Sequence, residues 1–297
     1  MADIKAFDLN LLRTLDALLE TRSVTRSADR LGVTQPAVSG MLARLREALD
    51  DPLFIRTQRG ILPTPRAEAL AGPLKAALAQ VEALLEPEVF DPARAALTLR
   101  IAATDYAQRV VVLPFLDALR REAPSVRLSV RPVAADFPQQ LAEGDLDLAL
   151  VTSDISPENL RARGLFYENY VTILREGHPA ASRSLDLDSF CALDHAIMSH
   201  DGTELRGATD DALERVGRKR NVVISLPGFA VLIDLIRRSD MIAMIPRRLL
   251  AGEGGIVLCE PPVPLDGFRK ILVWHERLQH DPAQAWLRQR LADSVID

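Results

Sequence analysis

The pattern of apolar residues changes once, near Leu97, and this change divides the chain into two kinds of structure. Before it, apolar residues recur at intervals of three and four, as on one face of an α-helix. After it, short apolar segments alternate with segments of helical spacing, in two successive sets. Such alternation is typical of open, largely parallel sheets. We therefore expect a helical N-terminal part followed by two α/β lobes, with a ligand cleft at the carboxyl ends of their strands.

Three helices are predicted in the first fifty residues. Asp8 is a suitable N-cap for the first helix, and Ser23 is one for a short second helix. Gly32 supplies the turn that follows, because glycine readily adopts a positive φ. Thr34 caps the third helix, and Pro36 falls in its first turn, where a missing N–H breaks no intrahelical bond.

The third helix has one apolar and one polar face. Its apolar stripe consists of Val38, Leu42, Leu45 and Leu49. The opposite surface carries Gln35 and Ser39 near the N-terminal end. Two helices joined by a glycine turn, the second with such a face, are typical of a helix-turn-helix, whose second helix reaches base edges in DNA. The alternative is that the helix pair serves packing alone.

The stretch "DPLFIRTQRGILPT" predicts two short extended pieces around Arg59 and Gly60. We interpret it as a β-wing whose Arg56 and Arg59 contact phosphates or the minor groove. Residues 21–66 hold eight arginines and four acidic residues, a local net charge of +4 on a chain whose net charge is −5. A compact basic segment on an acidic chain is typical of a small DNA-binding module attached to other domains.

The run from "FDLNLL" to "TPRAEAL" resembles the N-terminal winged helix-turn-helix of LysR-type transcriptional regulators. The matching motifs are "SVTRSADRLG", "TQPAVS" and "DPLFIR" followed by "PTPR". The resemblance implies an α+β multidomain protein with a winged helix-turn-helix, a linker helix and a two-lobed α/β effector domain like a periplasmic binding protein. It implies that the DNA-contacting residues are Thr34, Gln35, Pro36, Ser39, Arg56 and Arg59. The chain departs from the family at Gly40, where relatives often carry a longer polar or basic side chain.

The domain boundaries that we expect are 1–66 for the DNA-binding domain, 67–90 for the linker helix and 91–297 for the effector domain. Lobe I takes about 91–165 and 268–297, and lobe II takes about 166–267. The linker helix has apolar residues at the a and d positions of a heptad repeat, a pattern suited to packing against a second helix. These residues are Ala67, Ala71, Leu74, Leu78, Val81 and Leu85. The alternative is a helix packed on its own chain. The resemblance favours a homodimer that forms through this helix and assembles into a homotetramer. It also implies binding to a near-palindromic operator in double-stranded DNA. If the protein is an activator, RNA polymerase is a further partner.

Polar and aromatic residues follow the expected strands of the two lobes. The candidate effector-binding residues are Thr104, Tyr106, Thr152, Ser199, His200 and Phe229. Hydroxyl groups and free N–H groups at helix N-termini favour an anion, and the rings can flank a flat molecule. The tail "ILVWHERLQHDPAQAWLRQRL" and the N-terminal stretch are most similar to regulators related to nodulation and aromatic-degradation activators. The leading hypothesis for the effector is a small aromatic acid or phenolic compound.

Motifs of other function classes are missing from the sequence. There is no phosphate-binding loop, nucleophile elbow, zinc-protease motif or clustered Cys/His set, so we expect no enzyme activity, no cofactor and no metal. The N-terminus lacks an apolar signal segment and no apolar run approaches ~18 residues, which favours a cytoplasmic protein without a membrane partner. An α/β solute-binding or metabolic protein with an incidental helical domain, and an architectural DNA-binding protein without a ligand, are the alternatives.

Overall fold

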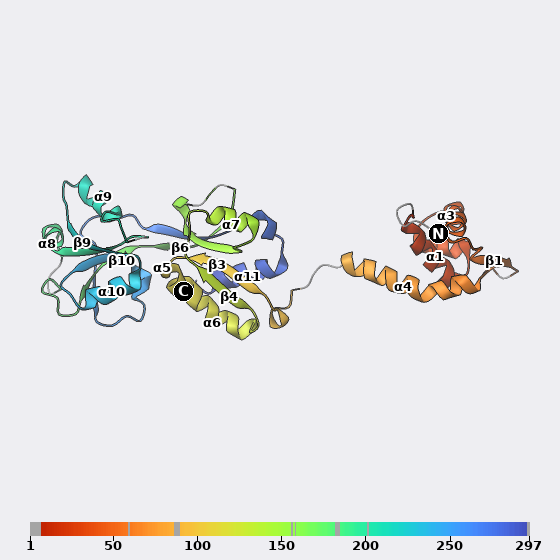
Figure 1. Cartoon of the computed structure of the whole chain (residues 1–297), viewed down its shortest axis with the longest axis horizontal. Helices are drawn as coiled ribbons and strands as arrows, with labels where there is room; N and C mark the ends of the chain where they lie inside the picture. The colour runs from red at the N-terminus through yellow and green to blue at the C-terminus, as the bar shows by residue number, and fades with distance from the viewer. Residues whose placement is uncertain are drawn as a thin grey trace. The chain divides into compact units, whose positions relative to one another are not determined.

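The protein is described by a computed structural model that covers residues 7–58, 60–85, 90–155, 157, 159–181, 185–200 and 202–295. The chain forms two compact units, Met1–Glu88 and Val89–Asp297. The first unit is largely helical, and the second contains two mixed sheets with helices on their faces (Figure 1). Within the described residues, no helix has the length and apolar content that crossing a membrane requires.

The first unit contains four helices and a short hairpin among its described residues. They are α1 (Asn10–Thr21), α2 (Val24–Leu31), α3 (Gln35–Leu49), β1 (Phe54–Thr57), β2 (Gly60–Pro63) and α4 (Pro65–Leu85). The core is formed by the apolar faces of α1 and α3, with Leu15, Leu18, Val38 and Leu45 fully enclosed. The Ser23 hydroxyl caps α2 by accepting from the backbone N–H of Arg26.

Helix α1 begins two residues after the expected cap. Leu9 occupies the N-cap position, and Asp8 Oδ1 accepts from the backbone N–H of Asn10 at 3.0 Å. The turn between α2 and α3 is as expected, because Gly32 adopts a φ of 67° at the C-cap. Thr34 holds the extended N-cap conformation of α3, but its side chain makes no capping hydrogen bond.

Helix α4 runs through Pro73 as one helix. Ala67 and Leu74 in its first half are buried against the core of the first unit. Further along, Val81, Leu84 and Leu85 are exposed. The N-terminal half of the apolar seam therefore packs on its own chain, and the C-terminal half has no cover in the described part of the unit.

Lobe I of the second unit is built on a five-stranded sheet in the order β4-β3-β5-β12-β6. Strands β3, β4 and β5 are parallel, while β12 runs antiparallel to β5 and β6. The strands are β3 (Thr98–Ala103), β4 (Arg127–Arg131), β5 (Leu148–Thr152), β6 (Arg161–Glu168) and β12 (Phe268–Trp274). The helices are η1 (Pro92–Arg94), α5 (Asp105–Ala107), the π-helical η2 (Gln108–Val112), α6 (Leu113–Glu122), α7 (Phe137–Glu143), η3 (Ser153–Ile155), η5 (Glu276–Leu278) and α11 (Pro282–Asp293).

Lobe II has a second five-stranded sheet in the order β11-β7-β10-β8-β9. Here β8, β9 and β10 are parallel and β7 and β11 join antiparallel. The strands are β7 (Tyr170–Arg175), β8 (Asp194–Met198), β9 (Asn221–Leu226), β10 (Ile242–Pro246) and β11 (Ile256–Cys259). The helices are α8 (Leu187–Ala192), α9 (Ala208–Arg215), α10 (Phe229–Arg237) and η4 (Arg247–Leu250).

Two crossovers join the lobes. The first passes from β6 to β7 at Asn169, and the second returns from β11 to β12 over 260–267. The crossovers approach each other closely at Gly267, where an added Cβ would lie 2.0 Å from the carbonyl oxygen of Glu168. Only glycine fits at that position. The antiparallel strands that the sequence pattern did not indicate, β6, β7 and β11, are the ones that lead into and out of these crossovers.

Candidate functional site

The polar face of α3 is exposed along the segment where base contacts were expected. Gln35, Pro36 and Ser39 are all exposed, while Val38 between them is 0% exposed. The helix therefore presents its polar face outward because the apolar stripe is held in the core. Thr34, just before the helix, is exposed as well. This is the geometry with which the N-terminal end of a recognition helix enters a major groove.

Gly40 lies in the next position of the same exposed face. A Cβ added there would have no atom within 4 Å, so packing does not require glycine. Arg46, further along the polar face, forms hydrogen bonds within the first unit. Its guanidinium donates to the carbonyl oxygens of Pro52 and Phe54 at 2.7 and 3.0 Å, which ties α3 to the start of the wing.

The wing is a two-stranded hairpin in which Arg56 is exposed and pairs with Ile61. Arg59, the second wing residue expected to contact DNA, lies outside the described residues. Gly60 adopts a φ of +130°, and an added Cβ would lie 2.8 Å from the carbonyl oxygen of Arg22. That carbonyl accepts from the N–H of Ile61 at 3.2 Å. The wing is thus anchored to the end of α1 through a position that excludes any side chain.

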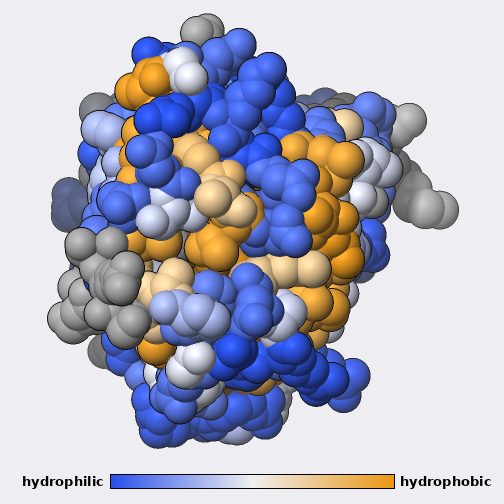
Figure 2. Space-filling view, turned by 90° about the vertical axis from the view of Figure 1, so that its left-hand side faces the viewer, coloured by the Kyte–Doolittle hydropathy of each residue, from blue (hydrophilic) through white to orange (hydrophobic). Residues whose placement is uncertain are grey.

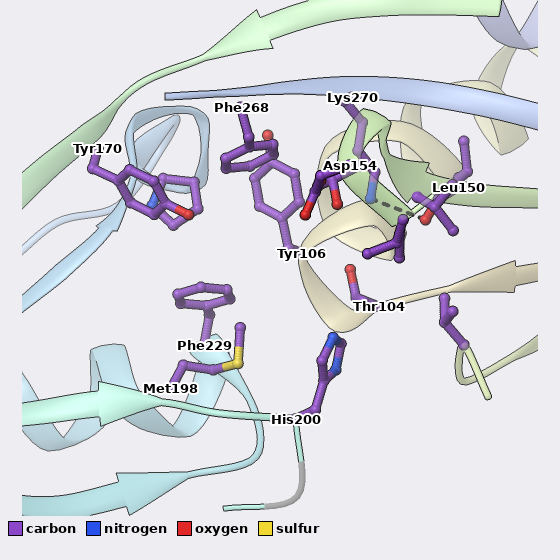
Figure 3. Close-up of a pocket in the computed structure, with 15 residues that line it drawn as sticks. Thr104, Tyr106, Leu150, Asp154, Tyr170, Met198, His200, Phe229, Phe268 and Lys270 are labelled. Atoms are coloured by element: carbon purple, nitrogen blue, oxygen red, sulfur yellow. Dashed lines mark hydrogen bonds between the residues drawn. The ribbon is translucent and has the colours of Figure 1, made fainter. Parts of the chain in front are cut away.

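A cavity of about 270 Å³ lies in the second unit at the carboxyl ends of β3, β5 and β8 (Figure 3). Five of the six candidate effector residues line it, namely Thr104, Tyr106, Thr152, His200 and Phe229. The remaining lining residues are Val133, Leu150, Val151, Asp154, Ile155, Tyr170, Met198, Pro246, Phe268 and Lys270. Both lobes contribute, because the lining extends from β3 and β5 to β8 and β10.

Ser199 is the candidate that does not line this cavity. Its hydroxyl pairs with the hydroxyl of Ser225 at 2.8 Å and accepts from the backbone N–H of Glu204. These bonds hold the loop after β8 against β9. The neighbouring His200 lines the cavity instead, and Figure 3 shows its ring extending toward Thr104.

Aromatic side chains form much of the cavity wall. The Tyr106 ring meets Phe229 and Phe268 edge-on, at centroid distances of 6.4 and 5.6 Å, and Tyr170 packs on Phe268 at 5.6 Å. The Tyr106 hydroxyl donates to Oε2 of the buried Glu168 at 2.5 Å. Burial, with this hydrogen bond and the nearby carboxylate, raises the pKa of Tyr106, and burial raises that of Tyr170. Both rings therefore present neutral phenols to a ligand.

The most distinctive polar group of the cavity is the ammonium of Lys270. Its side chain belongs to β12 and is 2% exposed. Nζ donates to the carbonyl oxygen of Leu150 at 2.9 Å and lies 5.8 Å from the centre of the Tyr106 ring. Burial lowers the pKa of Lys270 to about 8, against the opposing effect of the Asp154 carboxylate. The ammonium can donate three hydrogen bonds, so two remain for a bound anion.

Sequence reasoning missed Lys270, although "FRKILVW" carried a signal. A lysine followed directly by four apolar residues either reaches the surface or is buried for a purpose. Strand β12 lies inside its sheet, between β5 and β6, and Lys270 is buried while the neighbouring Arg269 is exposed. Tyr170 and Phe268 were missed because each directly follows a crossover between the lobes, and the sequence pattern did not place these crossovers.

The N-terminus of α10 differs from the expectation of free N–H groups. The carboxylate of Asp105, on α5 of lobe I, accepts from the backbone N–H of Phe229 at the first position of α10 in lobe II. Gly228 precedes that helix without a side chain of its own to cap it. A carboxylate of the protein therefore occupies this position, whereas the ammonium of Lys270 is a charged donor that a ligand anion can contact. Among the described residues, no group of three acidic, His or Cys side chains could hold a metal ion.

Comparison with known proteins shows the same two-part organisation. Residues 9–68 match the family model of a bacterial regulatory helix-turn-helix protein of the lysR family, and residues 93–295 match the LysR substrate binding domain. The chain is 36% identical to the transcriptional activator NagR of a Ralstonia species over 97% of both chains. It is 35% identical to the transcriptional activator NahR of Pseudomonas putida, over 99% of this chain and 100% of that one.

Solved structures agree with these matches. The regulatory domain of MexT, a transcriptional activator in Pseudomonas aeruginosa, aligns with a TM-score of 0.59 at 30% identity, over 67% of this chain and 98% of that chain. A full-length OxyR variant from the same organism aligns with a TM-score of 0.67 over 98% of this chain and 100% of its own, at 18% identity. The second likeness concerns the fold alone.

Proposed function

This chain belongs to the LysR family of DNA-binding transcriptional regulators with an effector-binding domain, and we propose that its effector is a monocyclic aromatic acid or phenol bound in the cavity between the lobes. The observation that carries the proposal is the buried ammonium of Lys270 in a wall of aromatic rings. A buried cation without an ionised partner in contact is costly. A carboxylate or phenolate of the ligand would pair with it.

The size of the cavity favours a single ring. A cavity of roughly 150 Å³ accommodates benzene, and this one measures about 270 Å³. The volume lies just below the range of drug-sized ligand pockets, roughly 300–1,000 Å³. The edges and faces of Tyr106, Phe229 and Phe268 would flank the ring. The Thr104 hydroxyl accepts a hydrogen bond from the backbone N–H of Ala107. Its own hydrogen can be donated to the anion of the ligand.

Thr34, Gln35, Pro36 and Ser39 are proposed as the major-groove contacts, and Arg56 and Arg59 as the wing contacts to phosphates or the minor groove. The exposure of the polar face of α3 supports the first set, and a glutamine at such a position can pair bidentately with adenine. The domain limits 1–66, 67–90 and 91–297 remain part of this proposal.

We further propose a homodimer through α4 that assembles into a homotetramer. The exposed apolar residues Val81, Leu84 and Leu85 support this, because a second copy of the helix would bury them. A two-fold dimer reads two half-sites of a near-palindromic operator. If the protein is an activator, RNA polymerase is its further partner. Since its target is chromosomal DNA, we propose that it acts in the cytoplasm.

The effector would act by changing how the two lobes sit against each other. The cavity is lined from both lobes, so a ligand that contacts both stabilises one relative pose of them. A change in that pose would alter how effector domains assemble in the oligomer, and with it the spacing or bending of the DNA between half-sites.

The test is a ligand panel on the purified full chain, read by thermal unfolding and by binding to the DNA upstream of its own gene. Benzoate, 4-hydroxybenzoate and phenol are the probes, and cyclohexanecarboxylate is the matched control with the same anion and no aromatic ring. We expect a rise in melting temperature and an altered footprint with at least one aromatic probe and a smaller effect with the control. No response to any of the three aromatic probes would refute the proposal.

A further inference from the structure

A second cavity of about 110 Å³ lies in lobe II beside the first one. The two cavities share three lining residues, Tyr170, Met198 and Phe229. Figure 3 shows these three on one side of the main cavity, with Lys270 and Leu150 on the other. Met198 lines both cavities, and methionine is unbranched and adapts its shape readily to a neighbouring group. A ligand anchored at Lys270 therefore has the second cavity at its far end.

Thr209 gives the second cavity a polar group that a ligand can contact. Its side chain lines the cavity and is only 6% exposed. A threonine hydroxyl can donate one hydrogen bond. A ligand atom in the second cavity can therefore accept from it.

Arg220 adds further donors to the same wall. Its guanidinium pairs with both carboxylate oxygens of Asp210, at 2.9 and 2.6 Å, and Nη1 lies 3.5 Å from Nδ1 of His195. Burial lowers the pKa of His195 to about 4, so the imidazole is neutral. These contacts use three of the five N–H groups of the guanidinium, and two remain.

The charge of the second cavity is balanced by a direct ion pair between Arg220 and Asp210. The side chain of Arg220 is 1% exposed and its charge is compensated by Asp210. A second ligand anion would therefore compete with Asp210, whereas a neutral acceptor would bind beside the pair. The volume leaves room for about three or four heavy atoms, taking ~30 Å³ for each water-sized group. The lining thus selects a short, neutral hydrogen-bond acceptor.

We propose that the effector is a two-ended molecule: an aromatic acid whose ring carries a compact neutral acceptor, such as an acyl group, which occupies the second cavity and accepts from Thr209 and Arg220. This inference rests on the proposed binding of aromatic acids at Lys270 and specifies which of them bind well. Thr209 is then a specificity-determining residue. The ring and its anion are common to all aromatic acids, and the second cavity distinguishes among them.

The experiment compares two substituents of the same shape on the full chain by calorimetric titration. The acetyl group has a carbonyl acceptor and the isopropyl group has none, so the probes are 3- and 4-acetylbenzoate, their isopropyl counterparts and benzoate. One hydrogen bond corresponds to ~3- to 10-fold in affinity. We expect one acetyl isomer to bind more tightly than its isopropyl counterpart by that factor, and more tightly than benzoate.

Two variants of Thr209 make the comparison specific. Thr209→Val removes the hydroxyl with little change of shape and should bring the acetyl-to-isopropyl ratio to within about twofold, with benzoate affinity unchanged. Thr209→Ser keeps the hydroxyl and should keep the preference. Equal affinities of acetyl and isopropyl probes for the native chain, or an unchanged ratio in Thr209→Val, would overturn the inference while benzoate still binds. If benzoate and all its derivatives fail to bind the native chain, the proposed function itself falls, and this inference with it.

Discussion

The hydroxyl of Tyr106 donates to Oε2 of Glu168 at 2.5 Å, and this bond joins the wall of the effector cavity to the first crossover between the lobes. Glu168 ends β6 and is 2% exposed. The same carboxylate also accepts from the backbone N–H groups of Asn169 and, in lobe II, Arg248. A residue whose ring lines the cavity thus holds the crossover with its hydroxyl.

Replacement of Tyr106 by phenylalanine should therefore destabilise the effector domain. The buried carboxylate of Glu168 would lose one donor, which costs about 1–3 kcal/mol. Chemical unfolding of the full chain measures the change in the free energy of unfolding. Tyr167→Phe is the matched control, because that side chain is 53% exposed and should tolerate the loss of its hydroxyl. Equal effects of the two substitutions would contradict the role given to the Tyr106–Glu168 bond.

Lys270 should give the stability of the protein a particular pH dependence. Its folded-state pKa is about 8 and its ordinary value is 10.5, so between these values the unfolded chain binds more protons than the folded one. Stability contributed by this group therefore rises from pH 8 to 10.5, with a slope of up to about 1.4 kcal/mol per pH unit. The difference in unfolding free energy between the native chain and Lys270→Met isolates this slope. A flat difference across that range would show that the ammonium is not buried as described.

The same ammonium should make ligand binding depend on pH in the opposite direction. Below pH 8 Lys270 is charged in the free protein, and benzoate affinity should be constant there. Above pH 8 the affinity should fall by up to about tenfold per pH unit as the amine loses its proton. Titration calorimetry at several pH values measures this, and an affinity that stays level to pH 10 would exclude Lys270 as the anion partner.

Gly40 should be replaceable without harm to the fold. Its added Cβ would meet no atom within 4 Å, and glycine inside a helix is less favourable than alanine by about 0.5–1 kcal/mol. Gly40→Ala should raise the free energy of unfolding by that amount. Gly40→Arg should tighten DNA binding in a salt-dependent way through one added phosphate contact. If Gly40→Ala instead weakens operator binding, the glycine is there to let the helix approach the DNA backbone.

Gln35→Ala should weaken binding to the operator by ~1–3 kcal/mol, the discrimination of one bidentate base contact. Binding to non-specific DNA should barely change. The control is Gln80→Ala, the same change on the exposed surface of α4. Footprinting and competition with non-specific DNA measure both affinities. If both DNAs lose affinity equally, Gln35 contacts the backbone and does not read a base.

The sequence was sufficient for the elements whose determinants are local. The turn at Gly32, the exposed polar face from Gln35 to Ser39 and the hairpin of the wing follow from spacing and capping within a few residues. Thr104 and Thr152 could be expected at the cavity for a similar reason, since each follows or ends a strand that was recognisable by its apolar pattern.

The rest of the site depends on pairings between distant segments. Lys270 faces the cavity because β12 inserts between β5 and β6, a pairing across more than one hundred residues. Asp105 caps a helix 124 positions away, and no local pattern shows that the N–H of Phe229 is already taken. Ser199 and His200 are neighbours, and only the pairing of β8 with β9 decides that Ser199 turns to Ser225 while His200 lines the cavity.

The most direct test of the account is the calorimetric titration of benzoate into the native chain and into Lys270→Met at pH 7, with Thr209→Val as a control that leaves the anion site intact. We expect benzoate to bind the native chain and Thr209→Val with equal affinity. Its affinity for a folded Lys270→Met should be lower by about 10- to 100-fold, the loss of a charge-assisted hydrogen bond. Equal binding of benzoate by the native chain and Lys270→Met would contradict the claim that this buried ammonium recognises the effector.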